Sequence, residues 1–347
     1  MPRRTWYVNE SELDDYQIKV IERRTENSFI VKGCAGSGKS ILALWKAKQI
    51  QATPNMGSFY VIVFTKALRQ FMLDGINEIG IKTDRVLYHW QWENTMHKSS
   101  ADYIIVDEAQ DFSKSEIDVF KGAAKKALIL YGDSAQQIYN GLKKDLMTME
   151  ELAVYTRYPF EQLVFNHRMP KTIAKMAQYL NSEDDDLALR CTKDGNELPK
   201  IIKYSSLNAQ LDSIITIINN RHFEDIGILF SHNENVKYAF DYLTKKGMNV
   251  EARYSRGAQN NVMSLDFSSD NPKLMTYHSA KGVQFESVFL PECSENDKKY
   301  KEPIYVAITR SYQSLYIMHS GNLSSFFDEI PSNLYETSLT GQTTSRL

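Results

Sequence analysis

The sequence predicts an α/β fold made of two domains, each built on a parallel sheet. First, a length of 347 residues is right for two domains of ordinary size. Second, short continuous runs of Val, Ile and Leu alternate with helical stretches, as in parallel strands that helices cover on both faces. Third, these runs form two series that meet near Pro159. We therefore expect one domain over residues 1–159, a second over 160–335 and a polar tail over 336–347.

The expected strands follow from the apolar runs in chain order. In the first domain they cover residues 28–31, 59–64, 103–107 and 127–132. In the second domain they cover residues 162–165, 226–230, 273–277, 286–290 and 315–319. Each run is short and bounded by polar or turn-forming residues, which is typical of buried strands.

Composition and charge limit the class of protein. With 42% hydrophobic and 24% charged residues, the chain has the make-up of a soluble globular protein. No apolar run is long enough to span a bilayer, so we expect a cytoplasmic protein with no membrane partner. The three cysteines are scattered without a CxxC pair, which argues against a disulfide framework or a zinc site. A net charge of −2 argues against coating nucleic acid by charge alone, yet allows a local basic groove.

The segment "GCAGSGKS" (33–40) is typical of a loop that holds a phosphate chain. It fits G-x-x-x-x-G-K-[ST], with an apolar strand before it and a helical stretch after it. Its glycines let backbone N–H groups turn toward the phosphates, while Lys39 reaches the β- and γ-phosphates and Ser40 ligates Mg²⁺. The motif therefore predicts binding of ATP and Mg²⁺. The expected nucleotide contacts are Gly33, Ala35, Gly36, Ser37, Gly38, Lys39 and Ser40.

The segment "YIIVDEAQDF" (103–112) supplies the acidic groups that a phosphate loop needs. Asp107 ends an apolar strand, where its carboxylate can hold Mg²⁺ through water. Glu108 beside it can orient or deprotonate the water that attacks the γ-phosphate.

Further segments follow one another in the order found in a known family. They are "LDDYQ", "VFTKALRQF", "VLYHW", "DEAQ", "LYGDSAQQIY", "FNHRMPKTI", "TYHSAKGVQFESVFLP" and "YVAITRSYQSLYI". With these motifs the chain resembles the superfamily 1 helicases of the UvrD/Rep type over nearly its whole length. The resemblance implies two RecA-like P-loop NTPase domains, with the ATP site in the cleft between them.

The resemblance also assigns roles to residues outside the phosphate loop. It implies that Gln17 reads the adenine base, that Gln284 contacts the ribose, and that Gln136 couples the γ-phosphate to the nucleic-acid site. It places Arg168 and Arg310, both in the expected second domain, at the phosphates. An arginine there stabilises charge on the γ-phosphate and contributes a factor of about 10³–10⁵ in rate. The implied contacts to nucleic acid are Thr65, Lys66, His89, Tyr139 and His278.

The chain departs from the family at several positions. Only short segments occupy the places of the two accessory domains, 1B and 2B, so we expect these domains to be absent or vestigial. Relatives carry a base-stacking tryptophan where this chain has Gly141. The loss weakens the grip on a strand unless Tyr139, Trp90 or Trp92 substitutes, although core packing is the more ordinary role of the two tryptophans. In addition, His167 replaces the tyrosine of the family's N-Y-R-S motif, and Gln284 replaces a glutamate.

Two classes of function follow from this reading. The first is an ATP-dependent translocase or helicase on single-stranded DNA, with RNA not excluded. Its 3′→5′ polarity is implied by the resemblance, and weak unwinding is expected without a protein partner such as a nuclease. The second is an ATP-hydrolysing regulatory subunit or switch, for example in a bacterial defence or repair complex, that senses nucleic acid or a partner without unwinding. Stimulation of ATP hydrolysis by single strands separates the two.

Overall fold

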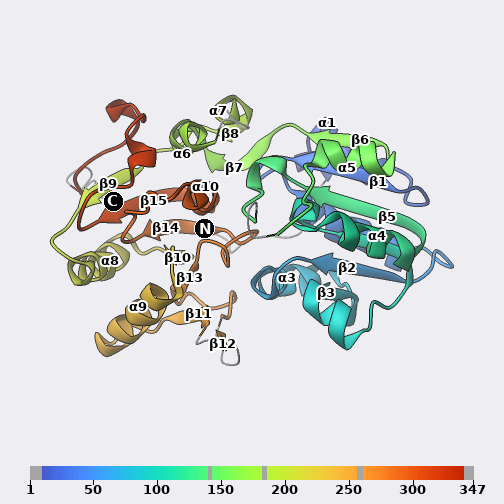
Figure 1. Ribbon diagram of the computed structural model, residues 1–347, viewed down its shortest axis with the longest axis horizontal. Helices are drawn as coiled ribbons and strands as arrows, with labels where there is room; N and C mark the ends of the chain where they lie inside the picture. The colour runs from blue at the N-terminus through green and yellow to red at the C-terminus, as the bar shows by residue number, and fades with distance from the viewer. Residues whose placement is uncertain (1–9, 140–142, 182–185, 256–260, 264, 340–347) are drawn as a thin grey trace. The chain divides into compact units, whose positions relative to one another are not determined.

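The computed structural model describes residues 10–139, 143–181, 186–255, 261–263 and 265–339 (Figure 1). The chain divides into two compact units after Arg168. Each unit contains one large sheet of mostly parallel strands with helices packed on it, so the predicted α/β class is confirmed.

The first unit is built on a six-stranded sheet in the order β3-β2-β4-β5-β1-β6, and all its neighbouring strands are parallel. The strands are β1 (Phe29–Gly33), β2 (Phe59–Val63), β3 (Val86–Tyr88), β4 (Ala101–Val106), β5 (Ala124–Gly132) and β6 (Phe160–Leu163). The central strands are buried on both faces, which is why their sequences are continuously apolar rather than alternating.

Helices cover both faces of this sheet (Figure 1). They are α1 (Asp15–Glu22), α2 (Lys39–Ala52), α3 (Lys66–Ile79), α4 (Lys114–Ala123) and α5 (Met149–Thr156). The helices α1, α2 and α3 contact one another on one side, while α4 and α5 pack on the side of Ile62, Ile104 and Leu128. Local sequence fixes several helix starts, since Ser113 and Thr148 each form a capping box with the glutamate three residues later.

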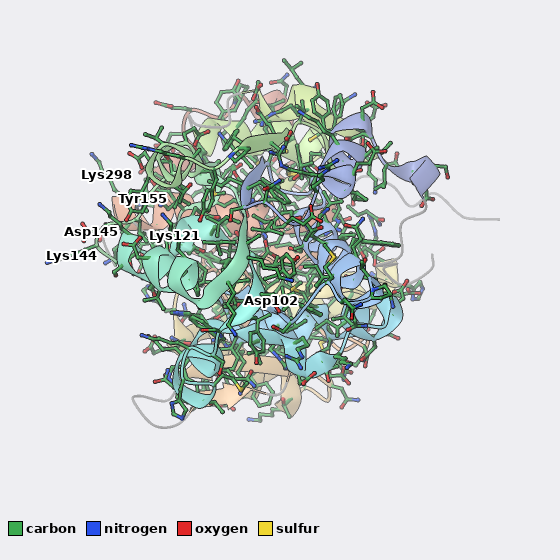
Figure 2. The ribbon with its side chains drawn as sticks, turned by 90° about the vertical axis from the view of Figure 1, so that its right-hand side faces the viewer. Asp102, Lys121, Lys144, Asp145, Tyr155 and Lys298 are labelled. Carbon is green, nitrogen blue, oxygen red and sulfur yellow. The ribbon has the colours of Figure 1, made fainter. Side chains whose placement is uncertain are left out.

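The end of this sheet remote from the phosphate loop is tied by one carboxylate. Asp102, labelled in Figure 2, accepts hydrogen bonds from the backbone N–H and the hydroxyl of Ser58, at 2.8 and 3.0 Å. These bonds lower the pKa of Asp102 below its ordinary value. Gly57, the residue before Ser58, has a φ of 129°. A Cβ at Gly57 would lie 2.4 Å from the Asp102 carboxylate, so only glycine fits this turn.

The second unit is built on a seven-stranded sheet in the order β12-β11-β13-β10-β14-β15-β9. Its strands are β9 (Lys200–Lys203), β10 (Ile226–Phe230), β11 (Glu251–Ser255), β12 (Asn261–Met263), β13 (Lys273–Thr276), β14 (Phe285–Leu290) and β15 (Ser311–His319). All pairs are parallel except that of β11 with the edge strand β12.

The helices of the second unit are α6 (Lys171–Ala177), α7 (Leu187–Arg190), α8 (Leu207–Arg221), α9 (Asn233–Lys245) and α10 (Lys301–Ile308). The helix α9 packs on β10, β11 and β13 and α8 packs on β15, and their apolar faces form a core with Phe230, Leu274 and Phe289. The helix α10 packs on α6, β14 and β15. Two short strands, β7 (Asn166–Pro170) and β8 (Cys191–Lys193), form a separate two-stranded sheet.

The structure differs from the expected organisation at the boundary between the domains. The run expected at 162–165 was assigned to the second domain, but β6 pairs with β1 in the first sheet, and the division falls after Arg168 rather than after Pro159. An apolar run shows that a strand exists but not which sheet it joins. The expected tail also begins too early, because the backbone of Glu336 bonds to Pro199 and Ile201 beside β9. Residues 340–347 lie outside the described part of the chain.

Within the residues that the structure describes, every helix is too short or too polar to cross a lipid bilayer.

Candidate ATP-binding and hydrolysis site

The candidate site lies along one edge of the first sheet. Because the strands of this sheet are parallel, the residues that follow them meet at the same edge. The phosphate loop follows β1, Asp107 follows β4, and Asp133 follows β5. The fold thus brings together three motifs that are far apart in the sequence.

The backbone of the phosphate loop has the form that phosphate binding requires. Gly36 and Gly38 have positive φ values of 73° and 88°, which other residues rarely adopt, and α2 begins directly afterwards at Lys39. The N-terminus of α2 therefore carries unsatisfied N–H groups and a positive dipole end. The Ser37 hydroxyl is buried and has no hydrogen-bond partner within the described structure. A Cβ at Gly33 would lie 2.3 Å from that hydroxyl, so glycine keeps the loop open.

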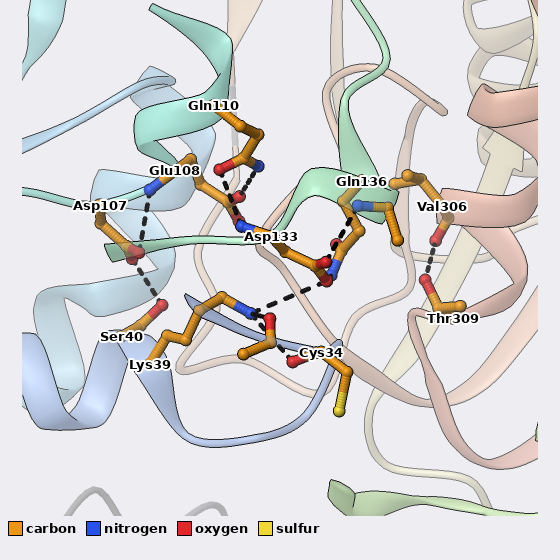
Figure 3. A network of polar contacts seen from close by, with 12 residues as sticks. Cys34, Lys39, Ser40, Asp107, Glu108, Gln110, Asp133, Gln136, Val306 and Thr309 are labelled. Carbon is orange, nitrogen blue, oxygen red and sulfur yellow. Dashed lines mark hydrogen bonds and ion pairs between the residues drawn. The ribbon is translucent and has the colours of Figure 1, made fainter. Parts of the chain in front are cut away.

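The side chain of Lys39 lies inside this loop (Figure 3). Its Nζ donates to the carbonyl oxygens of Gly33 and Cys34, at 2.7 and 2.9 Å. The same Nζ lies 3.9 Å from Oδ2 of Asp133. The ammonium is thus buried and oriented by three oxygen atoms, as expected for a group that meets the phosphates of a nucleotide.

Ser40 and Asp107 form the candidate Mg²⁺ site. The Ser40 hydroxyl donates to Oδ2 of Asp107 at 2.6 Å (Figure 3). Asp107 is fully buried, and this burial, together with the charge of Glu108, raises its pKa to about 6. The described residues hold no group of three or more His, Cys, Asp or Glu side chains that could bind a metal alone. A hydroxyl and one carboxylate suit Mg²⁺, which keeps water and phosphate oxygens as its other ligands.

Glu108 is held in an uncommon backbone conformation. Its φ of 58° and ψ of 45° lie in the left-handed region, which costs a non-glycine residue roughly 1–2 kcal/mol. Its side chain is buried, and Oε2 accepts a hydrogen bond from Nε2 of Gln110 at 2.6 Å. Such strain persists where the surrounding structure enforces it, often at functional sites. The carboxylate is therefore fixed beside Asp107.

Two residues that the sequence analysis did not select, Gln110 and Asp133, join these groups into one network (Figure 3). Oε1 of Gln110 accepts from the backbone N–H of Asp133 at 3.0 Å. Oδ2 of Asp133 accepts from Nε2 of Gln136 at 2.5 Å. The network therefore runs from Glu108 through Gln110 and Asp133 to Gln136, with Lys39 beside it. One signal in the sequence marks Asp133, since it directly follows an apolar strand, as Asp107 does.

Gln17 belongs to a second hydrogen-bonded group that surrounds the phosphate loop. Asp14 caps α1 and accepts from the backbone N–H of Gln17 at 2.8 Å, while Gln17 Nε2 donates to the carbonyl oxygen of Ser37 at 3.1 Å. The other carboxylate oxygen of Asp14 lies 2.6 Å from Nε2 of His167. The backbone N–H of His167 donates to the carbonyl oxygen of Gly36 at 3.2 Å, which closes a ring of contacts around the loop.

The structure corrects the placement of Arg168. We expected it in the second domain, but it ends the first unit. Its backbone N–H donates to the Asn166 side chain at 2.9 Å, and its Cβ lies 3.2 Å from the position that a Cβ at Gly36 would occupy. The physical reason is the pairing of β6 with β1, which carries the residues after β6 to the phosphate loop.

The second unit holds the remaining residues expected at the nucleotide. Nε of Arg310 donates to the carbonyl oxygen of Val306 at 2.9 Å, and Nη2 donates to the Thr309 hydroxyl at 3.0 Å. Thr309 also donates to Val306, at 2.8 Å (Figure 3). The guanidinium thus lies at the C-terminal end of α10, where the helix dipole favours a cation. Gln284 is buried before β14. The contacts of Arg310 and Gln284 with a nucleotide stay predictions.

The residues expected to contact nucleic acid lie just after strands, except Tyr139, which follows a short 3-10 helix (Ser134–Gln136). Thr65 follows β2 and caps α3 by accepting from the Leu68 backbone, and Lys66 beside it is exposed. His89 is largely covered and packs edge-on against aromatic side chains, and its burial lowers its pKa. Tyr139 packs against a phenylalanine of the first unit. His278, in the second unit, follows β13, and its burial also lowers its pKa. Their contacts with nucleic acid stay predictions.

Comparisons with known proteins agree with the motifs. An AAA domain model matches residues 17–142, and a model of the viral superfamily 1 RNA helicase core domain matches residues 218–319. The chain is 25% identical over 254 residues to a probable DNA helicase of Mycoplasma pneumoniae; the match covers 63% of this chain and 44% of that protein. The chain therefore spans less than half the length of this relative.

Among solved structures, the chain is similar to the C-terminal domain of a possible DNA helicase from Lactobacillus plantarum WCFS1. The TM-score is 0.39 at 12% identity, over 49% of this chain and 98% of that one.

The motifs in their order, the phosphate loop at the end of a parallel strand and the two matched domain models together support the resemblance of this chain to the superfamily 1 helicases.

Proposed function

We propose that this protein hydrolyses ATP with Mg²⁺ and uses the reaction to move along single-stranded DNA. The observation that carries the proposal is the hydrogen-bonded network from Glu108 through Gln110 and Asp133 to Gln136. It links the group that faces the expected attacking water to the motif expected to sense nucleic acid. A change at either end therefore has a continuous buried path to the other.

The residues of the first unit divide the work of hydrolysis. The loop amides and Lys39 hold the phosphates of ATP. Ser40 and Asp107 hold Mg²⁺, which neutralises charge that develops on the phosphate oxygens. Glu108 orients the attacking water and accepts its proton, and Gln136 reports the state of the γ-phosphate. The roles of Arg168, beside Gly36, and of Arg310 follow from the resemblance. In the proposal both supply positive charge to the phosphates.

The finer parts of the proposal concern the nucleic-acid substrate and partners. In the places of the accessory domains, the described residues form a π-helix (Gln91–Thr95) before β4, and the strands β11 and β12 before β13. We therefore propose weak unwinding by this chain itself, 3′→5′ movement, and a protein partner such as a nuclease that supplies a further surface. RNA is the alternative strand.

The proposal is tested by measuring ATP hydrolysis without nucleic acid and with single-stranded DNA, duplex DNA and RNA. We expect single-stranded DNA to raise the rate most strongly. Because strand binding releases counterions, the logarithm of affinity is expected to fall with the logarithm of salt concentration, with a slope of about −0.7 per phosphate contacted. A Lys39→Ala variant is the control for contaminating ATPases.

Two other outcomes separate the alternatives. A rate that no nucleic acid changes, but that a protein partner raises, contradicts the motor and supports an ATP-driven switch. Equal stimulation by duplex and single strands contradicts the proposed substrate while leaving the hydrolysis site intact.

The ring of contacts around the phosphate loop makes a second prediction. An Asp14→Ala substitution removes both the cap of α1 and the partner of His167, so Gln17 loses its fixed position. Loss of an N-cap costs about 0.5–2 kcal/mol, and we expect the KM for ATP to rise roughly 2- to 30-fold with a smaller change in kcat.

The matched control is Asp15→Ala, which removes an exposed carboxylate from the same turn. Steady-state kinetics with ATP and GTP measure both effects, and discrimination between the two bases is expected to fall only for Asp14→Ala. An unchanged KM in that variant contradicts a positioning role for Asp14.

A further inference from the structure

The structure distinguishes the three aromatic residues that could replace the missing base-stacking tryptophan. The family position, Gly141, lies outside the described residues. Trp92 is fully buried, and its indole N–H donates to the carbonyl oxygen of Ser99 at 3.1 Å. Tyr139 packs on Phe64, with ring centroids 4.8 Å apart. Trp90 is different, because 58% of its surface is exposed.

The ring of Trp90 is held rather than loose. It stacks on Tyr88, with centroids 6.1 Å apart and an angle of 11° between the planes. Its backbone directly precedes the π-helix that begins at Gln91, and its carbonyl oxygen accepts from Nδ2 of Asn94 at 2.9 Å. Short π-helical turns often occur at functional sites. A rigid aromatic face that points to solvent loses little conformational entropy when a base stacks on it.

Trp90 lies beside the residues expected to bind a strand. In the pairing of β2 with β3, Val63 is opposite Tyr88. Thr65 and Trp90 each lie two residues past the end of one of these neighbouring parallel strands, so both are at the same edge of the sheet. The Thr65 hydroxyl takes the N–H of Leu68, so the preceding N–H groups at the start of α3 remain available to a ligand. A phosphate at this helix N-terminus therefore lies at the same edge of the sheet as Trp90.

The charges around this pair of rings suit a polyanion. Lys66 is exposed in the first turn of α3. Arg69, one turn later, donates to the Val86 carbonyl oxygen at 2.7 Å. Two acidic side chains in this region are paired with lysines: Glu93 with Lys98 at 2.9 Å, and Glu116, which lies 3.8 Å from His89, with Lys143 at 2.6 Å.

We propose that Trp90, stacked on Tyr88, is a platform for one base of a single strand whose adjacent phosphate lies at the N-terminus of α3. The assignment rests on the proposed function, because it requires that the chain bind single strands. It names the aromatic group that takes over stacking in this chain.

The test compares two fluorescein-labelled ligands of equal length, an oligothymidylate and an abasic oligonucleotide, by fluorescence anisotropy. Removal of an aromatic face weakens binding by a factor of roughly 5–150 per base, so Trp90→Ala is expected to lose that much affinity for oligothymidylate. The same variant is expected to bind the abasic strand as the unmodified protein does, which also shows that it is folded. Trp90→Phe is expected to keep most of the affinity.

Tyr155→Ala is the matched control. Tyr155 is an exposed aromatic residue of α5 in the same unit, labelled in Figure 2, and its ring is engaged by Lys114 while its hydroxyl donates to Asp118. Its removal is expected to leave binding of both oligonucleotides unchanged.

Three outcomes overturn the assignment. If Trp90→Ala binds oligothymidylate as tightly as the unmodified protein, the platform is wrong but strand binding stands. If the variant loses affinity equally for the abasic strand, Trp90 acts through the fold and not through a base. If the unmodified protein binds neither oligonucleotide, the proposed motor function fails together with the platform.

Discussion

A Glu108→Gln substitution is expected to lower the rate of ATP turnover by a factor of about 10²–10⁴ while leaving ATP binding nearly intact. The amide has the size of the carboxylate and keeps an oxygen that can accept from Gln110, whose Nε2 lies 2.6 Å from Oε2. It has no negative charge and cannot take a proton from water. Single-turnover hydrolysis and binding of a fluorescent ATP analogue measure the two effects separately.

The control for this prediction is Glu150→Gln. Glu150 lies on α5 in the same unit, pairs with Lys32 and accepts from the hydroxyl of Ser134, the residue after Asp133, but is not itself part of the proposed hydrolysis site. Its turnover is expected to stay within about twofold of the unmodified protein, since an exposed pair contributes little. Full hydrolytic activity in purified Glu108→Gln would show that another group activates the water.

An Asp107→Asn substitution is expected to have two opposite effects. It removes the carboxylate of the proposed Mg²⁺ site, so hydrolysis is lost. It also raises the free energy of unfolding at neutral pH in the absence of nucleotide, because a buried charge is replaced by a neutral amide that can still accept from Ser40. Both effects have one cause: the carboxylate that hydrolysis needs lowers the stability of the folded protein when no nucleotide is bound.

The sign of the stability change follows from the pKa. Asp107 has a pKa of about 6 in the folded protein, above its ordinary value of 3.8, so the folded state holds this proton more tightly than the unfolded state does. The side chain's contribution to stability is therefore lost as pH rises from about 4 to about 6, on the order of 3 kcal/mol in all. Chemical denaturation should show a gain for Asp107→Asn at pH 7 that shrinks near pH 4.

Asp102→Asn is a control for which the free energy of unfolding is expected to change in the opposite direction. Hydrogen bonds from Ser58 lower the pKa of Asp102, so its charged form stabilises the folded state at neutral pH. Neutralising it is expected to lower the free energy of unfolding at pH 7. A less stable Asp107→Asn variant at pH 7 contradicts the argument from burial.

Local patterns predicted the parts of the fold that depend on local chemistry. The strands with continuous apolar runs, such as β2 and β10, are confirmed because burial on both faces demands such runs. The strands β9 (Lys200–Lys203) and β11 (Glu251–Ser255) were missed because charged residues interrupt their apolar pattern, a lysine at each end of β9 and Glu251 and Arg253 in β11. In the structure Lys273 and Lys200, both buried, pair with Glu251 and Glu336. Because a distant partner neutralises each charge, charged residues can be buried in a strand, and the apolar pattern that predicts a strand is then missing.

The candidate site was predicted in part for the same reason. The phosphate loop and the Asp107–Glu108 pair have fixed spacing, and their backbone shapes are set by neighbouring residues. Gln110 and Asp133 were missed because their role depends on a hydrogen bond between the segments that follow β4 and β5. The spacing of residues in the sequence does not predict this bond. Arg168 was placed in the wrong unit because the partner of β6 was not known.

The sequence by itself determined that this chain carries a P-loop motif and the motifs of the superfamily 1 helicases, since those features depend on residue type and spacing. Only the tertiary structure decided that Trp90 is exposed while Trp92 is buried, and that His167 and Asp14 close a ring around the phosphate loop. Trp90 and Trp92 have nearly the same sequence neighbours, so local sequence does not tell them apart. Asp14 and His167 are far apart in the chain, so no local pattern connects them. Which side chain meets solvent, and which meets a distant partner, is settled by how strands pair and helices pack.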